Sequence, residues 1–401
     1  MRDDILRATL IAAIALTMLL TFTCAAPGQE RLAKKSAAYL RTVQSSDGGF
    51  SEPGAGSELG LSCWCVMAGT AAGEDAGSWK LQGGSSTARD YLVSQAGSDM
   101  SLTDTELLTL ALARCGADPR KASGRDLVAL IKSYAGDDGK LGEGLEQHCL
   151  GMMALRAAGE QMPAVSIDWL LSQQGGEGAW DKEGGSVTAA TALAAETLSS
   201  TGGTGTEAVE KGLKYLRTKM VDDGGFPERS GQSDSQETAR VVRAIVAAGQ
   251  KPSDKAWDSH GSTPESYLQS MQSSDGRQAF SKGVESEPSM TTALATLAFA
   301  GKSLSAGTAT VETNATTGAV HDDGTTGAGM VAGKGPPVGE STKPDADGTD
   351  LRSASGGAFG RRAGWFSGLY AFLAVCAFYL VMLVALSALA YMALGSFRKS
   401  R

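Results

Sequence analysis

The chain has 401 residues, a formal net charge of −8 and a sequence pI of about 5.1. A chain this acidic, with no basic stretch away from the flanks of its apolar C-terminal segment, lacks the surface that binds phosphate backbones, which excludes a nucleic-acid partner. Its 52 glycines and single asparagine are typical of a protein from a high-GC bacterium.

The N-terminal segment, residues 1–26, has the features of a signal peptide. Arg2 and Arg7 precede an uncharged, mainly apolar run over residues 8–22, and Cys24 is followed by two alanines that suit a cleavage site. Acylation of Cys24 and retention of the segment as an anchor are the two alternatives. In all three cases we expect the rest of the protein to lie outside the cell.

Residues 31–303 contain one pattern six times. An aromatic residue or Leu is followed by an aliphatic residue, then by an acidic residue or Asp-Gly eight positions on, and then by an apolar anchor. A degenerate repeat of this length is typical of helical hairpins. The units start at Tyr39, Tyr91, Leu130, Trp169, Tyr215 and Tyr267, and their anchors are Phe50, Leu102, Leu141, Trp180, Phe226 and Phe280.

Each unit has a second half that is apolar nearly all round and rich in alanine, and it usually ends in glycine, as at Gly69 and Gly301. Such a helix must be covered on all sides, whereas the first half has a single apolar stripe. We therefore predict an outer amphipathic helix and an inner buried helix in each unit. Asp-Gly is predicted to end the outer helix, and the final glycine the inner one, in left-handed caps.

The first and last units are as apolar as the middle ones, which favours a closed ring over an open solenoid with polar ends. With its Asp-Gly-Gly-Phe turns and Thr-Ala-rich inner helices, the stretch 31–303 resembles the prenyltransferase and squalene–terpene cyclase repeat family. The resemblance implies an all-α fold, an α/α toroid of six helical hairpins (an α6-α6 barrel). It does not by itself imply an activity.

Zinc members of that family bind the metal with an Asp, a Cys and a distant His. The candidates here are Asp104, Cys115, His148 and Cys149, without the family's Asp-x-Cys spacing. His148 and Cys149 are adjacent, so on a helix they point about 100° apart and do not easily share one ion. We therefore predict no metal and no cofactor.

The class II cyclases of the family use an Asp-x-Asp-Asp-Thr-Ala motif to protonate an alkene. The corresponding stretch, 234–239, reads DSQETA, with Gln236 and Glu237 where two aspartates belong. Gln236 breaks the coupling between carboxyl groups on which such an acid depends. Asp234 with Glu237 is better interpreted as a helix capping box, as is Thr103 with Glu106.

Two further groups of toroid proteins differ from this chain in their motifs or domains. The complement-type thioester domain needs Gly-Cys-Gly-Glu-Gln, and the nearest string, LEQHC over residues 145–149, has the wrong order. Transcobalamin-like toroids resemble the chain as secreted ligand cups without a catalytic motif, although their small partner domain has no counterpart here.

The chain after the toroid changes character. Residues 304–362 are rich in Thr, Gly, Ala, Ser and Pro and too poor in large apolar residues to fold, so a disordered linker is predicted. Residues 365–396 are uncharged and long enough for a transmembrane helix, and the tail 397–401 is basic. These features predict a single-pass type I protein of the cell membrane with its toroid extracellular.

The predicted function is a non-catalytic ligand-binding or interaction module on a tether, with a small apolar ligand, a surface protein or a cell-envelope component as partner. The alternative is a prenyltransferase- or terpene-cyclase-like enzyme acting on an isoprenoid. Candidate ligand-binding residues, chosen for chemistry on or near the inner helices, are Trp64, Glu106, His148, Trp180 and Glu237. A disulfide is possible among Cys63, Cys65, Cys115 and Cys149, and the alternative is that all four are small buried core residues.

Overall fold

The computed structural model describes residues 27–181, 185–203, 205–228 and 231–304. The predicted signal peptide, transmembrane helix and cytoplasmic tail, and the predicted linker beyond residue 304, lie outside these residues. No helix within them is long and apolar enough to span a bilayer. The described chain is all-α, with isolated β-bridges in its turns and no extended strand.

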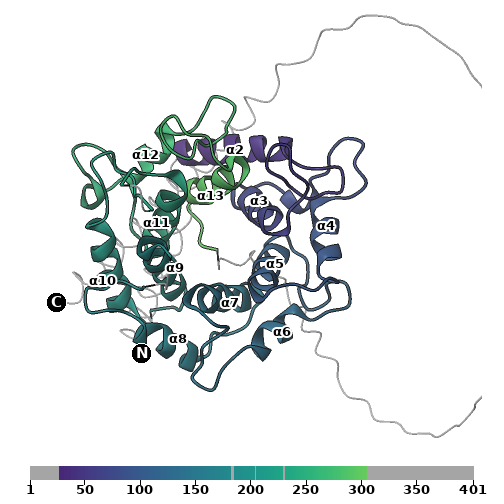
Figure 1. Ribbon diagram of the computed structural model, residues 1–401, viewed down its shortest axis with the longest axis horizontal. Helices are drawn as coiled ribbons and strands as arrows, with labels where there is room; N and C mark the ends of the chain where they lie inside the picture. Colours follow the sequence, from purple (N-terminus) through teal and green to yellow (C-terminus); the bar gives the residue numbers. More distant parts are fainter. Residues whose placement is uncertain (1–26, 182–184, 204, 229–230, 305–401) are drawn as a thin grey trace, which may run out of the picture. The chain divides into compact units, whose positions relative to one another are not determined.

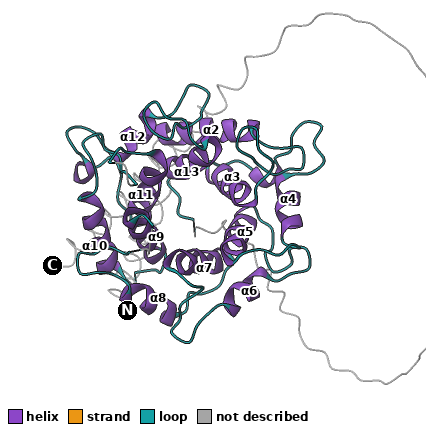
Figure 2. Cartoon of the chain, viewed as in Figure 1, coloured by secondary structure: helices purple, strands orange, loops and turns teal. Residues whose placement is uncertain are grey.

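The helices form two concentric circles, an outer one and an inner one (Figures 1 and 2). Outer and inner helices alternate along the chain, as the two halves of the repeat predict. The outer helices are α2 (Pro27–Thr42), α4 (Ala88–Gln95), α6 (Leu127–Ser133), α8 (Ala164–Ser172), α10 (Thr206–Arg217) and α12 (Pro264–Ser270). The inner helices are α3 (Leu59–Ala71), α5 (Leu102–Arg114), α7 (Leu145–Ala157), α9 (Val187–Ser199), α11 (Ser235–Ala247) and α13 (Pro288–Ala300).

The pattern of burial explains why each helix takes its circle. Inner helix α13 is buried along almost its whole length, from Ser289 to Ala300. Outer helix α10 buries only one stripe, which contains Val209, Leu213 and Leu216. A helix that is apolar all round needs neighbours on every side, and only the inner circle provides them. The predicted division into outer and inner helices is confirmed.

The ring is closed, because the last inner helix packs against the first. α13 contacts both α3 and α2, and each inner helix contacts the next around the circle. Hydrogen bonds secure this seam: the backbone N–H groups of Ser289 and Met290 donate to the Glu52 carboxylate, and the Ser36 hydroxyl donates to the Gly276 carbonyl. The α/α toroid of six hairpins is therefore present.

The Asp-Gly turns join one unit to the next instead of capping the outer helices. Helix α2 ends at Thr42, and Gly48 lies in a separate turn with a positive φ of 93°. A Cβ atom on Gly48 would overlap the Thr87 carbonyl, just before the next outer helix. The predicted left-handed cap is wrong here, because the glycine is needed for this close approach. Gly139, Gly178, Gly224 and Gly276 lie in the same way against Val165, Lys211, Thr263 and Lys35.

The residue after this turn fixes the start of the inner helix. The Phe50 N–H donates to the Ser62 hydroxyl, and the Trp180 N–H to the Thr191 hydroxyl, each in the first turns of an inner helix. In the last unit Gln278 has this position and is fully buried, whereas Phe280 is only partly buried. The predicted anchor Phe280 is therefore wrong, because the turn of this unit places Gln278 in the core.

Two other helix boundaries differ from the prediction. Helix α3 continues through Gly69 to Ala71, and Gly69 is required inside it because a Cβ there would overlap the Trp79 ring. Helix α5 is capped by Ser101, whose hydroxyl accepts from the Asp104 N–H. The predicted capping box of Thr103 with Glu106 is therefore wrong. Helix α13 does end in the predicted left-handed conformation, at Gly301, which has a φ of 62°.

Candidate functional site

A cavity of about 320 Å³ occupies the centre of the ring. Every inner helix contributes to its wall, so it exists only because the ring is closed. The lining is mainly aliphatic, with one aromatic residue and a few polar and charged ones. These are Trp64, Thr103, Leu107, Leu145, Glu146, Leu150, Ala189, Ala190, Leu193, Gln236, Arg240, Arg243, Glu287, Met290 and Leu294.

The cavity has a mouth and a floor, which can be told apart by position along the inner helices. Glu146 and Gln236 are second residues of their helices, and Glu287 precedes α13. Arg243 is the ninth residue of α11 and lies deepest. At 1.5 Å per residue, the seven steps from Gln236 to Arg243 correspond to a depth of about 10 Å.

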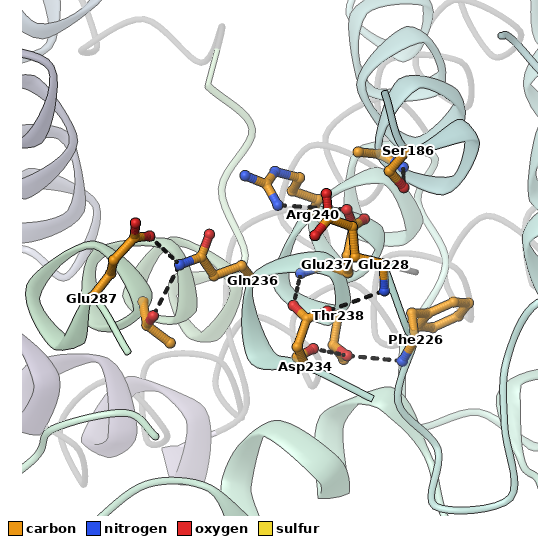
Figure 3. A network of polar contacts seen from close by, with 11 residues as sticks. Ser186, Phe226, Glu228, Asp234, Gln236, Glu237, Thr238, Arg240 and Glu287 are labelled. Carbon is orange, nitrogen blue, oxygen red and sulfur yellow. Dashed lines mark hydrogen bonds and ion pairs between the residues drawn. The ribbon is translucent and has the colours of Figure 1, made fainter. Parts of the chain in front are cut away.

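A polar network lies at the start of α11, on one side of the mouth (Figure 3). The Gln236 side-chain amide donates to the Glu287 carboxylate at 3.1 Å and to the Thr291 hydroxyl at 3.1 Å. Arg240 lies 3.8 Å from the carboxylate of Glu237, one turn earlier on the helix. Burial raises the pKa of Glu237 to about 7. The mouth therefore presents both charges and an amide group to an incoming molecule.

The floor consists of a buried ion pair. Arg243 donates from Nε and Nη2 to Oε2 of Glu196, at 3.2 and 3.0 Å, and both side chains are almost fully buried. The guanidinium carbon lies 5.7 Å from the centre of the Trp64 ring. The other carboxylate oxygen of Glu196 accepts from the backbone N–H of Leu304 at 2.9 Å. The chain leaving α13 therefore closes this end of the ring, where Figure 1 shows it running inward from α13.

Of the five candidate ligand-binding residues, only Trp64 lines the cavity. Glu106 is fully buried beside α7, where a Cβ on Gly151 would lie 2.9 Å from its carboxylate. Trp180 is fully buried and donates from Nε1 to the Leu170 carbonyl at 2.8 Å, so it belongs to the core. Glu237 is buried next to Arg240 and is not part of the lining.

His148 has a structural position. Its Nδ1 accepts from the Leu141 N–H at 3.0 Å, and its Nε2 lies 3.0 Å from the Ser166 carbonyl. The Leu141 N–H is the anchor N–H of the third unit, so His148 replaces the Ser or Thr hydroxyl that other units use. Its ring also packs on Trp169, on the outer helix, with ring centres 4.4 Å apart. It therefore faces the outer circle.

This position predicts a stability effect that depends on pH. Burial lowers the pKa of His148 to about 4, below its usual 6.5. Folding favours the neutral ring. The stability that the neutral ring contributes is therefore complete above pH 6.5, and about 3 kcal/mol of it is lost as the pH falls towards 4. Denaturant unfolding of His148→Ala at pH 7 should show a loss of about 2–3 kcal/mol, because the Leu141 N–H loses its partner.

That loss should shrink as the pH falls from 6.5 to 4. His260→Asn, at an exposed position whose φ of 53° asparagine tolerates, is the control and should leave the free energy of unfolding at pH 7 nearly unchanged. A His148→Ala variant as stable as the wild type at pH 7 would contradict the structural role.

The four cysteines of the toroid are buried free thiols. The possible disulfide is not formed in this structure, and burial raises the pKa of Cys149 to about 12. Among the described residues, no group of three or more His, Cys, Asp or Glu side chains is arranged to hold a metal ion.

The polar lining of the cavity was not predicted from the sequence. Gln236, Arg240 and Arg243 are four and three positions apart, so they follow one face of an inner helix. Polar residues at that spacing in a helix that must be buried are a signal that could have been used. Glu146 and Glu287 gave no such signal, because an acidic residue at or just before the start of a helix is common.

Neither the protein-family models nor the curated proteins give a match to this chain. Solved structures do resemble it. The type II terpene cyclase MstE from Scytonema, in its apo form, is 13% identical with a TM-score of 0.48, over 68% of this chain and 98% of that one. A protein from Actinoplanes is 15% identical with a TM-score of 0.49, again over 68% and 98%.

The ent-copalyl diphosphate synthase from Streptomyces platensis is 18% identical with a TM-score of 0.41, over 66% of this chain and 53% of that one. Similarities at this level of identity and score give no argument about activity. The toroid is established by the contacts of the ring itself.

Proposed function

We propose that the toroid is a binding module that takes a small, largely apolar molecule into its central cavity without transforming it. The cavity itself carries this proposal. Its volume of about 320 Å³ lies at the lower end of the range for small-molecule sites, roughly 300–1,000 Å³. Its wall is apolar between a polar mouth and a charged floor, which suits a molecule of limited length with one or two polar groups.

The side chains at the position of the cyclase acid motif are poorly suited to donating a proton. Asp234 caps α11 by accepting from the Glu237 N–H at 2.8 Å, so its carboxylate is committed to holding the helix. Gln236 has the position of the central aspartate of the family motif and lines the cavity with an amide. An amide cannot donate a proton to an alkene, which favours binding over catalysis.

An enzyme acting on an isoprenoid is the second candidate. It is favoured by the apolar wall and by Glu287, whose carboxylate bonds to Gln236 at the mouth. Incubation with a linear isoprenoid diphosphate, followed by gas chromatography of the extract, tests it. Cyclised product from the wild type but not from Glu287→Gln would establish this candidate in place of the first.

The setting of the module is a proposal as well. A signal peptide at 1–26, a linker over 304–362 and a membrane helix at 365–396 would hold the toroid outside the cell on a tether. Protease added to intact cells should then release the toroid by cutting within the linker. Persistence of the full-length chain, while other surface proteins are digested, would contradict the arrangement.

Binding itself is tested with the neutral dye N-phenylnaphthylamine, whose fluorescence rises in apolar surroundings. Ala189, on α9, lines the cavity, so Ala189→Phe should fill part of it and weaken dye binding by at least about tenfold, or about 1.4 kcal/mol. Ala164→Phe, at an exposed position on α8, is the matched control. Equal binding by both folded variants would show that the dye is not in the cavity.

A further inference from the structure

Arg243 presents an unused donor at the cavity floor. It is 3% exposed, and its Nε and Nη2 are both occupied by Glu196. Its Nη1 is buried and has no hydrogen-bond partner among the described residues. Leaving a charged donor unpaired in a buried position is costly, so a partner for this group should come from elsewhere.

The charge around the floor favours an anion as that partner. Arg114 ends α5 at the same end of the ring and donates to the Ser303 carbonyl at 3.0 Å. The charge of Glu196, which is paired with Arg243, also acts on the guanidinium of Arg114, so two arginines at this end of the ring are balanced by one carboxylate. The two carboxylates that line the cavity, Glu146 and Glu287, lie at the mouth together with Arg240. Negative charge is thus disfavoured at the mouth and favoured at the floor.

The apolar part of such a ligand has a defined place. Trp64 borders the cavity near Arg243, and Leu150, Leu193 and Leu294 line the wall between the floor and the mouth. A flat or elongated apolar body about 10 Å long would fit between the two ends. An oxygen acceptor at one end of it would lie beside the Arg243 guanidinium, which lines the floor.

We infer that the ligand of the cavity is an organic oxyanion, a carboxylate on a compact apolar body, bound with its carboxylate at Arg243 and its body beside Trp64. This inference rests on the proposed binding function and adds the chemical class and orientation of the ligand. A charged acceptor on a guanidinium is among the stronger hydrogen bonds in proteins, so the carboxylate should contribute much of the affinity.

The wild-type protein alone tests the class of ligand. Naphthoate, naphthalene and naphthyl-trimethylammonium share one apolar body and differ in charge, and each can be titrated against bound N-phenylnaphthylamine. Naphthoate should bind about tenfold more tightly than naphthalene, and the cation most weakly. Equal affinities, or a preference for the cation, would overturn the inference. Failure of naphthalene and the dye to enter the cavity at all would instead refute the proposed function.

Variants test the orientation. Arg243→Lys keeps a positive charge beside Glu196 but lacks the second arm of the guanidinium, so the ratio of naphthoate to naphthalene affinity should fall to near one. Arg156→Lys, exposed on α7, is the control and should keep the wild-type ratio. A ratio that falls for Arg240→Lys and not for Arg243→Lys would place the anion at the mouth and overturn the inference. If Arg243→Lys does not fold, the affinities of the wild-type protein for the three naphthalene compounds still test the inference.

Discussion

Replacing Glu196 by alanine is expected to lower the free energy of unfolding by about 3–5 kcal/mol, because Arg243 would be left as an uncompensated buried charge. Both carboxylate oxygens of Glu196 are used, one by Arg243 and the other by the Leu304 N–H. The loss should appear in equilibrium denaturation as a lower midpoint with an unchanged slope.

Two comparisons separate charge from packing in this result. Glu207→Ala removes an exposed partner of Lys211 on α10 and should leave the denaturation midpoint unchanged. The double variant Glu196→Leu with Arg243→Met replaces the pair by apolar groups and should recover part of the loss. A Glu196→Ala protein within about 1 kcal/mol of the wild type would show that the pair is not buried in solution.

Glu106→Met is expected to act in the opposite direction and to stabilise the protein by about 2–4 kcal/mol at pH 8. Glu106 is fully buried, and neither carboxylate oxygen has a hydrogen-bond partner among the described residues. Burial, helped by the charge of Glu146, raises the pKa of Glu106 to about 9. Methionine has a similar length and flexibility and no polar atom to bury.

The pH dependence gives this prediction its sign. The folded-state pKa of Glu106 lies above the usual value of 4.5, so the stability contributed by its protonated form is complete below pH 4.5. It is lost by up to about 1.4 kcal/mol per pH unit as the pH rises towards 9. The advantage of Glu106→Met should therefore grow with pH over that range, whereas Glu210→Met, exposed on α10, should show no such trend. A constant difference would mean that Glu106 is ionised in the folded protein.

The fold was predictable because the repeat recurs in every unit. A run that is apolar all round requires neighbours on all sides, and similar first and last runs favour closure. The repeat did not reveal the role of its glycines. The sequence predicted Gly48 to be a helix cap, whereas in the structure it allows a close approach to Thr87, nearly forty residues later. A close approach between distant segments leaves no local signal.

The candidate site was predictable only in small part. Trp64 was found because a large aromatic residue stands out in a helix of small ones. His148 and Glu237 stood out for their chemistry, yet neither lines the cavity, and chemistry alone does not determine which face of a helix a residue occupies. Arg243 was missed because a buried arginine gains its meaning from Glu196, which is on another helix.

The most direct test of ligand binding in the central cavity is a crystal structure of the protein grown with bromonaphthalene, using the anomalous scattering of bromine. A bromine peak is expected inside the ring, between Trp64 and Leu294, with the side chains of the wall otherwise in place. A ring whose centre is filled by its own side chains, or bromine peaks found only on the outer surface, would contradict ligand binding in the cavity.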